Sequence, residues 1–552
     1  MKNYQSLYLL VVLFFLTISA SQAQKKSNNL ERPKLVVGIV VDQMRYDYLY
    51  RYWNKYGNGG FKRLIQDGFS YENAHYNYEP TYTGPGHASI YTGTTPAIHG
   101  IIGNNWYDRT TGQSVYCTDD KKVTSVGSTS PAGKMSPANL LATTITDELR
   151  LATNKQSKVI AICLKDRGSI LPAGHMANGA YWYDGSNGNW ITSTYYLPAL
   201  PTWVQNFNSR RLPDTYLNQP WNTLLPLAQY TESTPDDNEF ENKFSEESRP
   251  VFPHDLPKQR GTTYDLLRST PFGNTFTKEF AMEAVKAENL GKNSATDFLA
   301  LSFSSTDYVG HQFGPNAIET EDTYLRLDRD LADLLNYLDR QVGKNQYLVF
   351  LSADHGAALV PSYAGSQKLP SGSVAPRELQ DSVKNFLNRQ YGNGNWVLSF
   401  MNHQVYLNQP LATSRKLDLS QMQEKVAAYL ANFEGILKTT TASTLQSANF
   451  ETGLEAFSKR GYLRRRSGDV VLTLFPGWIE GTSGRETKGT THGTSFAYDT
   501  HVPILWYGWH VKPGASSERV SITDIAPTLA QWLHIMEPSG TTGRPLLEVL
   551  KK

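Results

Sequence analysis

Seven residues scattered along the chain have side chains that could together hold two metal ions and attack phosphorus. They are three carboxylates, three imidazoles and one hydroxyl: Asp42, Asp307, Asp354, His311, His355, His492 and Thr83. Mixed Asp and His ligands suit zinc, manganese or iron, and two such ions about 4 Å apart form the clamp used in phosphate-ester chemistry. Each residue is unremarkable alone, so the prediction depends on whether the fold brings them together.

Four short apolar runs end at or just before residues of this kind. The runs cover 35–41, 159–164, 298–303 and 347–351. The first two stop at Asp42 and Lys165, and the last two stop shortly before Asp307 and Asp354. Continuous apolar runs, rather than alternating ones, indicate strands covered on both faces, as in a parallel sheet between helices. Ligands of such sheets bind beyond the carboxyl ends of the strands, which is where these residues lie.

Helical patterns alternate with these runs, which predicts an α/β fold: a doubly wound, mostly parallel sheet with helices on both faces. The clearest helix is expected over 319–342, where an apolar stripe recurs at helical spacing and Gly343 is a suitable stop. Two segments break the alternation and are predicted to be insertions that form a cap beside the site, 171–261 and 361–460. The catalytic core would then comprise 24–170, 262–360 and 461–552.

Two of the predicted ligand pairs have informative spacing. Asp307-x-x-x-His311 follows a predicted strand directly, so both side chains can reach one ion from a turn or a first helical turn. That motif alone is more often a surface pair. In Asp354-His355-Gly356 the neighbouring ligands must point different ways, and the glycine permits a tight turn.

Two histidines near the C-terminal end compete for the last ligand position. His492 lies in a loop of small residues at 490–494, where the backbone can approach a ligand closely. His501 instead precedes a predicted strand, and we expect it to hydrogen bond to the start of that strand. His492 is therefore the predicted ligand.

Thr83 is the candidate nucleophile. It precedes a Gly84-Pro85-Gly86 turn, and proline suits the first position of a helix. The N-terminus of that helix would favour an alkoxide and a phosphate. A threonine hydroxyl becomes a good nucleophile only when a metal or a base lowers its pKa. The alternative is that Thr83 only caps the helix.

The ordered set of motifs resembles the alkaline phosphatase superfamily, in its type I phosphodiesterase/nucleotide pyrophosphatase branch. The segments that carry the resemblance are Thr83-Gly-Pro-Gly-His, Asn104 after Gly-Ile-Ile-Gly, Asp307-x-x-x-His311, Asp354-His355-Gly356 and Thr491-His492-Gly493. Within that branch, Lys165-Asp-Arg167-Gly-Ser resembles the PafA-like periplasmic phosphate-monoester hydrolases. The resemblance extends from Asp42 to the C-terminus.

The resemblance implies a role for each residue. One zinc ion would be held by Asp307, His311 and His492. The other would be held by Asp42, Asp354 and His355, with Thr83 bridging to it. The phosphoryl oxygens would be bound by Asn104, Lys165 and Arg167. A cationic pair of this kind rewards a dianionic monoester over a diester, and the arginine fork matches phosphate geometry.

The chain departs from its relatives at two points. The best-known phosphatases carry serine where this chain has Thr83, and no third carboxylate set is present for a magnesium ion. A sulfatase is disfavoured because no C-x-P-x-R surrounds the nucleophile. The prediction is an alkaline phosphatase with two Zn²⁺ per chain and a covalent phosphothreonine intermediate. The alternatives are a phosphodiesterase or nucleotide pyrophosphatase, a phosphonoacetate hydrolase, or a binding module that has lost its metals.

The first residues have the features of a signal peptide. Lys2 precedes an apolar run at 9–18, and Ser21 and Ala23 are small residues spaced for cleavage after Ala23. The run is short for a membrane span of about 20 residues. We therefore expect a periplasmic or secreted protein without a membrane anchor.

Composition narrows the range of partners. The 53 Lys and Arg nearly balance the 51 Asp and Glu, so nothing indicates a nucleic-acid partner. Small-molecule phosphate monoesters are the expected partners, and a monomer is favoured. Cys117 and Cys163 could form a disulfide, but because Cys163 lies in an apolar run, a buried free thiol is at least as well supported. The acidic stretch 232–247 fits no calcium-loop spacing and is expected to be a solvated loop.

Overall fold

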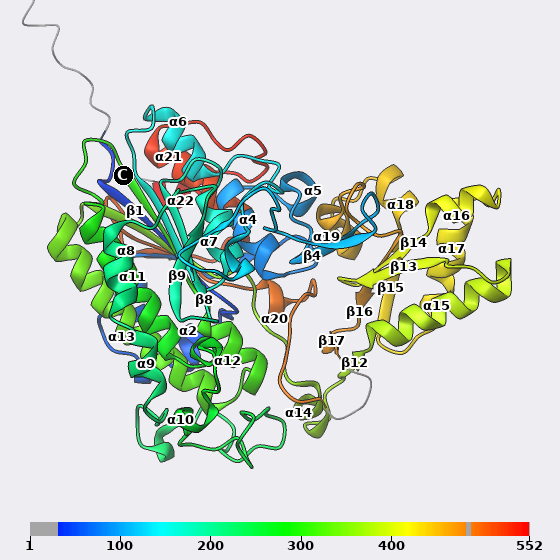
Figure 1. Ribbon diagram of the computed structural model, residues 1–552, viewed down its shortest axis with the longest axis horizontal. Helices are drawn as coiled ribbons and strands as arrows, with labels where there is room; N and C mark the ends of the chain where they lie inside the picture. Colours follow the sequence, from blue (N-terminus) through cyan, green and yellow to red (C-terminus); the bar gives the residue numbers. More distant parts are fainter. Residues whose placement is uncertain (1–30, 482–486, 551–552) are drawn as a thin grey trace, which may run out of the picture.

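The computed structural model describes residues 31–481 and 487–550. The predicted signal peptide at 1–23 lies outside these ranges. None of the helices within them has the length and apolar content that a membrane crossing requires. The described chain forms two lobes, a larger one around a wide sheet and a smaller one on the right of Figure 1.

The larger lobe is built on a ten-stranded sheet of order β19-β2-β18-β11-β1-β10-β7-β8-β9-β6. Its strands are β1 (Leu35–Val41), β2 (Phe69–Tyr71), β6 (Ser125–Val126), β7 (Val159–Cys163), β8 (Gly179–Asp184), β9 (Asn189–Ser193), β10 (Asp297–Phe303), β11 (Tyr347–Ser352), β18 (Ile504–Gly508) and β19 (Gly514–Ser516). The central strands β11, β1, β10, β7 and β8 are all parallel. Antiparallel pairs, β18 on β11 and β9 on β8, extend the sheet on either side.

Helices cover both faces of this sheet, which confirms the predicted α/β fold. Those of the larger lobe are α2 (Tyr48–Arg51), α3 (Phe61–Gln66), α4 (Thr83–Thr92), α5 (Pro96–His99), α6 (Ile145–Ala152), α7 (Asp166–Ala173), α8 (Thr202–Ser209), α9 (Leu212–Leu217), α10 (Leu256–Gln259), α11 (Phe272–Ala287), α12 (Ser305–Phe313), α13 (Ile318–Leu338), α20 (Ala497–Thr500), α21 (Ile525–Leu533) and α22 (Leu547–Leu550). Two short ladders join β3 (Ala74–His75) to β20 (Val520–Ser521), and β4 (Asn105–Asp108) to β5 (Gln113–Tyr116).

The apolar runs become strands because both of their faces are covered. All seven residues of β1 are buried. At Gly38 the packing is so close that a Cβ would lie 2.5 Å from side-chain atoms of Phe350 and Tyr91, so no larger residue fits. The helix expected over 319–342 is confirmed as α13, which ends at Leu338 and continues as a wider turn to Gly343.

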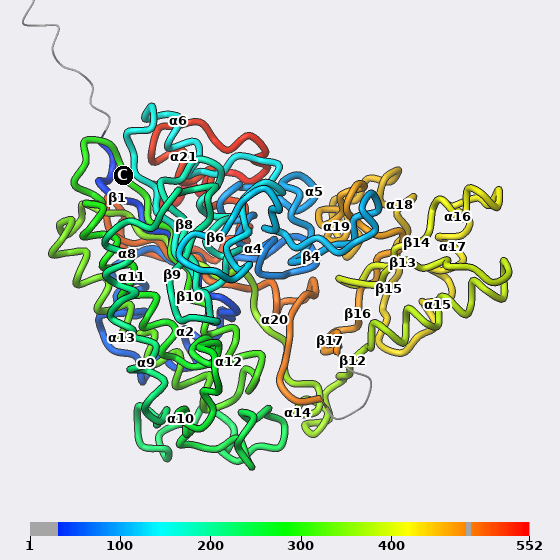
Figure 2. Tube along the Cα trace, viewed as in Figure 1, coloured from blue at the N-terminus to red at the C-terminus, as the bar shows by residue number. Residues whose placement is uncertain are grey.

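The smaller lobe has its own apolar core. Its four-stranded sheet has the order β13-β14-β16-β15. The strands of this part are β12 (Gly372–Val374), β13 (Val397–Met401), β14 (Gln404–Leu407), β15 (Ile436–Thr441), β16 (Val470–Leu474) and β17 (Trp478–Glu480). The helices are α14 (Pro361–Ser366), α15 (Pro376–Tyr391), α16 (Gln409–Ser414), α17 (Leu419–Leu430), α18 (Ala442–Ser447) and α19 (Gly453–Gly461). In Figure 2 the β4–β5 hairpin reaches from the larger lobe toward β13 and β14.

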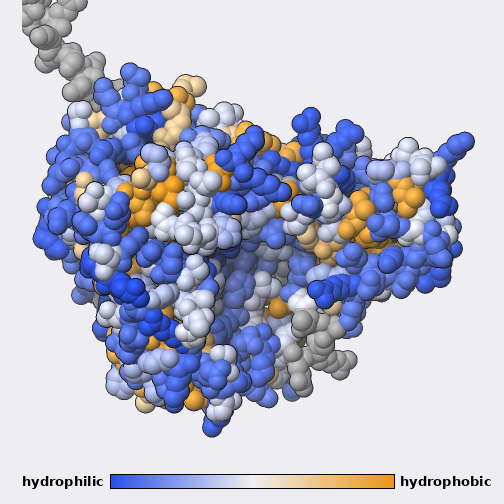
Figure 3. Space-filling model, viewed as in Figure 1, coloured by the Kyte–Doolittle hydropathy of each residue, from blue (hydrophilic) through white to orange (hydrophobic). Residues whose placement is uncertain are grey.

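The two segments expected to be insertions differ in how they relate to the sheets. Within 171–261, β8 and β9 belong to the main sheet, and only the residues after them lie outside it. The 361–460 segment supplies most of the smaller lobe, but that lobe also takes β16 from beyond the expected boundary. Figure 3 shows the surface hollowed between the lobes, with mainly hydrophilic residues in the hollow.

Two smaller expectations are also decided by the structure. Cys117 and Cys163 are both buried and free, so they form no disulfide. The expectation of a solvated loop at 232–247 is wrong for part of it, because Glu241 is only 2% exposed. Instead, the loop packs against α12 and α13.

Candidate metal centre and active site

The parallel register of three strands brings the predicted residues to one edge of the sheet. Val41 at the end of β1 pairs with Phe303 at the end of β10, and Val40 pairs with Ser352 at the end of β11. The residues that directly follow these three strands must therefore lie close together. Asp42 follows β1, α12 follows β10 with Asp307 and His311, and the Asp354-His355 pair follows β11.

The first candidate ligand group consists of Asp307, His311 and His492, whose side chains lie close enough together to hold one metal ion. The Asp307 Oδ1 atom lies 3.1 Å from His311 Nε2 and 3.7 Å from His492 Nε2. One helical turn of α12 separates Asp307 from His311. The Nδ1 atoms of His311 and His492 lie 2.7 Å from the carbonyl oxygens of Thr490 and Thr81. A histidine that donates from Nδ1 to a carbonyl keeps the Nε2 lone pair for a metal.

The second group surrounds the Nε2 atom of His355. Asp42 Oδ1 lies 3.5 Å from it, Asp354 Oδ2 3.6 Å and Thr83 Oγ1 3.4 Å. In a tetrahedral zinc site with bonds of about 2.1 Å, ligand atoms are about 3.4 Å apart. Asp42 Oδ1 and Asp354 Oδ2 are buried and have no hydrogen-bond partner in the described part of the chain. A metal ion would satisfy both, so these residues fit the group that the resemblance implies.

The electrostatics of the site suit metal ligation. Burial raises the pKa of Asp42, and the neighbouring carboxylates of Asp307 and Asp354 raise it further. Burial, followed by the nearby rings of His355 and His311, holds the pKa of His492 well below its usual value, so the ring is neutral. Burial lowers the pKa of His311, but the Asp307 carboxylate beside it raises the pKa above its usual value. Carboxylates that repel each other, and a neutral ring such as that of His492, are donors that a cation stabilises.

Thr83 is the first residue of α4, and its side chain does not cap that helix. The N-cap residue is Tyr82, without a side-chain cap hydrogen bond, which contradicts the alternative that Thr83 is only a cap. The amide nitrogen of Gly84 donates to Asn104 Oδ1 over 2.8 Å, so Asn104 lies against the same helix terminus. A Cβ at Gly86 would lie 2.3 Å from the Asp354 carbonyl oxygen, and this close approach sets α4 against the second ligand group.

Lys165 and Arg167 follow β7 at the same edge of the sheet. The Lys165 ammonium lies 2.7 Å from Asp42 Oδ2 and 2.5 Å from Asp307 Oδ2, so it bridges the two ligand groups. Arg167 donates to the Tyr116 hydroxyl over 2.9 Å. The Asp166 carboxylate between them instead accepts hydrogen bonds from hydroxyl groups.

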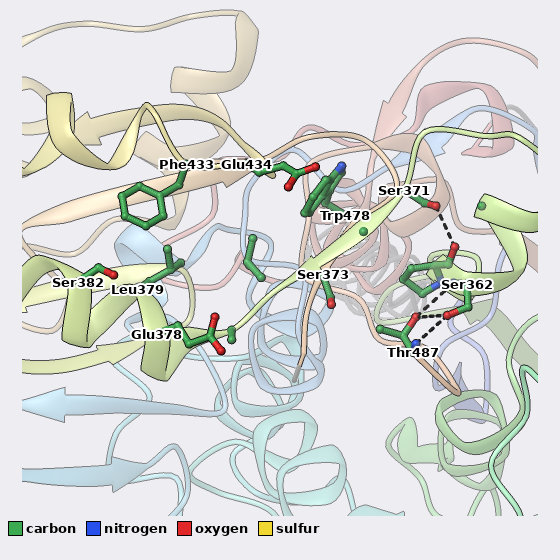
Figure 4. A pocket seen from close by; sticks show the side chains of 15 residues that line it. Ser362, Ser371, Ser373, Glu378, Leu379, Ser382, Phe433, Glu434, Trp478 and Thr487 are labelled. Atoms are coloured by element: carbon green, nitrogen blue, oxygen red, sulfur yellow. Dashed lines mark hydrogen bonds between the residues drawn. The ribbon is translucent and has the colours of Figure 1, made fainter. Parts of the chain in front are cut away.

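His501 lies outside both groups. Its Nε2 atom is 2.9 Å from the Glu72 carbonyl oxygen, and its ring stacks on those of His75 and Tyr46. A cavity of about 730 Å³ also lies apart from the seven residues, between α14, β12 and α15 (Figure 4). Trp478, which is labelled there, lines it, but none of the seven predicted residues does.

Sequence reasoning missed two residues that hold the ligands in place. Gln43 donates from Nε2 to Asp307 Oδ1 over 2.8 Å and from its main-chain nitrogen to Asp354 Oδ1 over 3.1 Å. Asp499 Oδ2 accepts from the main-chain nitrogens of Gly493 and Thr494 and from the Thr494 hydroxyl. Adjacency to Asp42 was a signal for Gln43. No sequence signal pointed to Asp499, because its hydrogen-bond partners come together only when the loop folds.

Comparison with known proteins places the chain in a family. The type I phosphodiesterase/nucleotide pyrophosphatase family matches residues 36–495. Alkaline phosphatase PhoV of Synechococcus elongatus is 48% identical over 98% of this chain and 99% of its own length. Alkaline phosphatase PafA of Elizabethkingia meningoseptica is 46% identical over 98% of both chains.

Solved structures agree with this placement. The crystal structure of wild-type PafA has a TM-score of 0.92 to this chain, at 46% identity, covering 95% of this chain and all of the other. A second PafA structure is that of a variant changed at a threonine, an asparagine, a lysine and an arginine, in that order. The chain therefore belongs to the type I phosphodiesterase/nucleotide pyrophosphatase family, together with the alkaline phosphatases PafA and PhoV.

Proposed function

We propose that this chain is an exported, zinc-dependent alkaline phosphatase that hydrolyses phosphate monoesters through a covalent phosphothreonine. The observation that carries the proposal is the position of the Thr83 hydroxyl. It starts α4, lies 3.4 Å from His355 Nε2 and faces the group that includes Asp42 and Asp354. Two relatives, PhoV at 48% identity and PafA at 46%, are named alkaline phosphatases, which supports the same activity here.

The two ligand groups would each hold one Zn²⁺. When bound, these ions would supply the positive charge that lowers the pKa of a hydroxyl and stabilises a departing oxygen. The chain's own contribution is to fix the donors. Asp307 and His311 are spaced by one helical turn, and Gln43 holds Asp307 from the other side. Asp499 holds the loop that carries His492.

In the first step, the Thr83 Oγ atom forms a bond to phosphorus while the bond to the leaving oxygen breaks. The N-terminus of α4 favours the negative charge that develops near Thr83. In the second step, the oxygen of a water molecule bonds to phosphorus and the Thr83 Oγ–phosphorus bond breaks. This sequence releases first the alcohol and then inorganic phosphate, and it returns Thr83 to its starting state.

Asn104, Lys165 and Arg167 are the proposed ligands of the phosphoryl oxygens. Asn104 lies against the N-terminus of α4, and Lys165 reaches both ligand groups. The PafA variant described above is changed at the same four residue types, in the order in which Thr83, Asn104, Lys165 and Arg167 occur here. Two cations facing one phosphoryl group favour the dianion of a monoester over a diester.

Export is supported by the sequence features before residue 24, and the proposed partners are small phosphate monoesters acted on by a monomer. The activity is tested with purified protein that is stripped of metal and then given Zn²⁺. Monoester and diester substrates with the same leaving group are compared. We expect loss of activity on stripping, recovery with about two zinc ions per chain, and a strong monoester preference. Full activity without metal, or a preference for the diester, would contradict the proposal.

A further inference from the structure

Arg167, one of the proposed ligands of the phosphoryl oxygens, is held in place by a single hydrogen bond. Its Nη1 atom donates to the Tyr116 hydroxyl over 2.9 Å, and it donates to no other group within residues 31–481 and 487–550. The Nε atom is buried and has no partner in the same ranges. A buried N–H group without an acceptor is costly, so this edge of the guanidinium suits a ligand that brings acceptor oxygens.

The direction of the Tyr116 hydroxyl follows from its second partner. Its oxygen lies 2.9 Å from Asp166 Oδ1, and the Thr118 hydroxyl oxygen lies 2.6 Å from the same atom. A carboxylate can only accept, so both hydroxyl groups donate to Asp166. The one proton of Tyr116 is therefore directed to Asp166, and its oxygen remains free to accept from Arg167. Asp166 in this way supports Arg167 through Tyr116.

Tyr116 belongs to the β4–β5 hairpin, which also positions Asn104. The last residue of β5 pairs with the first residue of β4, and the main-chain nitrogen of Cys117 donates to the Asn104 carbonyl over 2.9 Å. Cys117 packs on the first turn of α4, because a Cβ at Gly84 would lie 3.3 Å from its Sγ atom. This end of the hairpin therefore lies beside the helix start that carries Thr83.

The smaller lobe holds the other end of the hairpin, as Figure 2 shows. Arg109, which follows β4, donates to the Ser467 carbonyl over 2.7 Å and to the buried Asp469 carboxylate over 2.8 Å. Asn402, between β13 and β14, donates from Nδ2 to the Asn105 carbonyl over 2.6 Å. Because both ends of the hairpin are held, Tyr116 is a fixed point for Arg167.

We propose that Tyr116 is a positioning residue that orients Arg167 toward the transferred phosphoryl group. The inference rests on the proposed phosphatase function and names a residue that sets its preference for monoesters. An arginine side chain has many rotamers, and fixing them on binding costs affinity. Tyr116 occupies Nη1 in advance, which leaves Nε and Nη2 for two phosphoryl oxygens in the fork geometry that suits phosphate. A monoester offers more charged oxygens to this fork than a diester does.

Removal of the Tyr116 hydroxyl from the zinc-loaded full chain tests the proposal. Tyr116→Phe keeps the ring and should lower kcat/KM for p-nitrophenyl phosphate by about tenfold, since a hydrogen bond to a charged group is lost. The methyl diester with the same leaving group should lose less, and the metal content should be unchanged. The matched control is Tyr107→Phe on the same hairpin. Tyr107 packs on Tyr406, away from the Arg167 network, so this variant should keep both rates.

A double-mutant cycle separates positioning of Arg167 from a general structural role. If Tyr116 acts through Arg167, Tyr116→Phe should lower the monoester kcat/KM by less than about twofold once Arg167 is already alanine. An undiminished loss in the Arg167→Ala protein would overturn the inference, because Tyr116 would then act on the substrate or on the whole site. A wild-type monoester rate in Tyr116→Phe would overturn it as well.

Inorganic phosphate provides a second readout that does not depend on the leaving group. Its inhibition constant should rise by about tenfold in Tyr116→Phe and should rise little further when Arg167→Ala is added. An unchanged inhibition constant in Tyr116→Phe would contradict the positioning role. Failure of the proposed function would appear differently: a wild type that prefers the diester contradicts the phosphatase activity before any variant is compared, and the inference falls with it.

Discussion

The imidazole rings of His355 and His492 stack face to face, with their centroids 3.4 Å apart and their planes inclined by 12°. His492 belongs to the ligand group of Asp307 and His311, whereas His355 belongs to the group of Asp42 and Asp354. The contact therefore joins the two groups into one site. Two charged rings would repel each other in this contact, and burial lowers the pKa of each.

His492→Ala and His501→Ala should have different effects although the residues are close in sequence. The first removes a ligand atom and the ring that stacks on His355, so one of two zinc ions should be lost together with activity. The second removes a hydrogen bond to Glu72 and two ring contacts, so the metal content should stay at two. Elemental analysis of the two purified variants, alongside kcat/KM, checks this. An exchange of the two outcomes would show that the ligand assignment is wrong here.

Thr83→Ala should lower turnover by about 10³-fold or more, because it removes the nucleophile rather than a contact. The carboxylates and imidazoles remain, so the metal content should be little changed. Thr83→Ser keeps a hydroxyl at the same position and is the matched control, which should retain much of the activity.

The covalent step has its own measurement. Wild-type protein quenched with acid during turnover should carry phosphate on the peptide that contains Thr83, and Thr83→Ala should carry none. Phosphate on another residue, or an active Thr83→Ala protein, would rule out this nucleophile.

The sequence predicted which residues the fold brings together more completely than it predicted the lobes. The ligands follow buried strands, and continuous apolar runs such as 35–41 mark those strands within a few residues. The boundaries of the lobes were harder to predict from the sequence. β8 and β9 read as part of an irregular segment rich in Tyr, Trp and Asn, yet they pair with the main sheet. Strand pairing at a sheet edge depends on long-range contacts that local patterns do not contain.

Local sequence patterns also could not predict the residues that act by positioning other residues. Asp499 is a single carboxylate among ordinary neighbours, and its role appears only when the 490–494 loop folds back onto it. The burial of Glu241 depends in the same way on α13, which follows it by more than 70 positions in the sequence. The acidic composition alone predicted a solvated stretch, since charged residues are rarely buried.

Asp499 should make stability depend on pH. Burial raises its pKa from the ordinary value of 3.8 to about 7, although three hydrogen bonds to its Oδ2 lower it. A folded-state pKa above the unfolded one means that stability from this group is fully present below about pH 3.8 and is lost as the pH rises through about 7. Asn at this position cannot ionise. The free energy of unfolding of Asp499→Asn relative to wild type should therefore rise between about pH 4 and 7 and then level off.

Urea unfolding at constant zinc concentration measures this difference. Asp499→Ala is the companion variant, because it removes the hydrogen bonds as well as the charge. Loss of these contacts should loosen the loop of His492 and weaken zinc binding by about 10- to 100-fold, as for other partners of metal ligands. A pH-independent difference between Asp499→Asn and wild type would show that Asp499 does not titrate in this range.

Replacing Lys165 and Arg167 together by alanine should separate monoester from diester hydrolysis. Both residues follow β7 at the edge where the ligand groups lie, and Lys165 already reaches Asp42 and Asp307. A monoester offers these cations charged oxygens that a diester partly replaces with an alkoxy group. Each charge-assisted contact is worth about 1.5–3 kcal/mol, so monoester turnover should fall about 10²- to 10⁴-fold. Diester hydrolysis should fall far less.

The comparison uses p-nitrophenyl phosphate and its methyl diester, because the leaving group is then the same. Lys158→Ala is a suitable control, since Lys158 precedes the same strand at its opposite end and pairs with Glu288. It should change neither rate. Because Lys165 also neutralises Asp42 and Asp307, metal content must be measured in each variant, and a normal content isolates the effect on substrate. Equal losses of kcat/KM on the two substrates at normal metal content would mean that the pair supports the site as a whole and does not select the monoester.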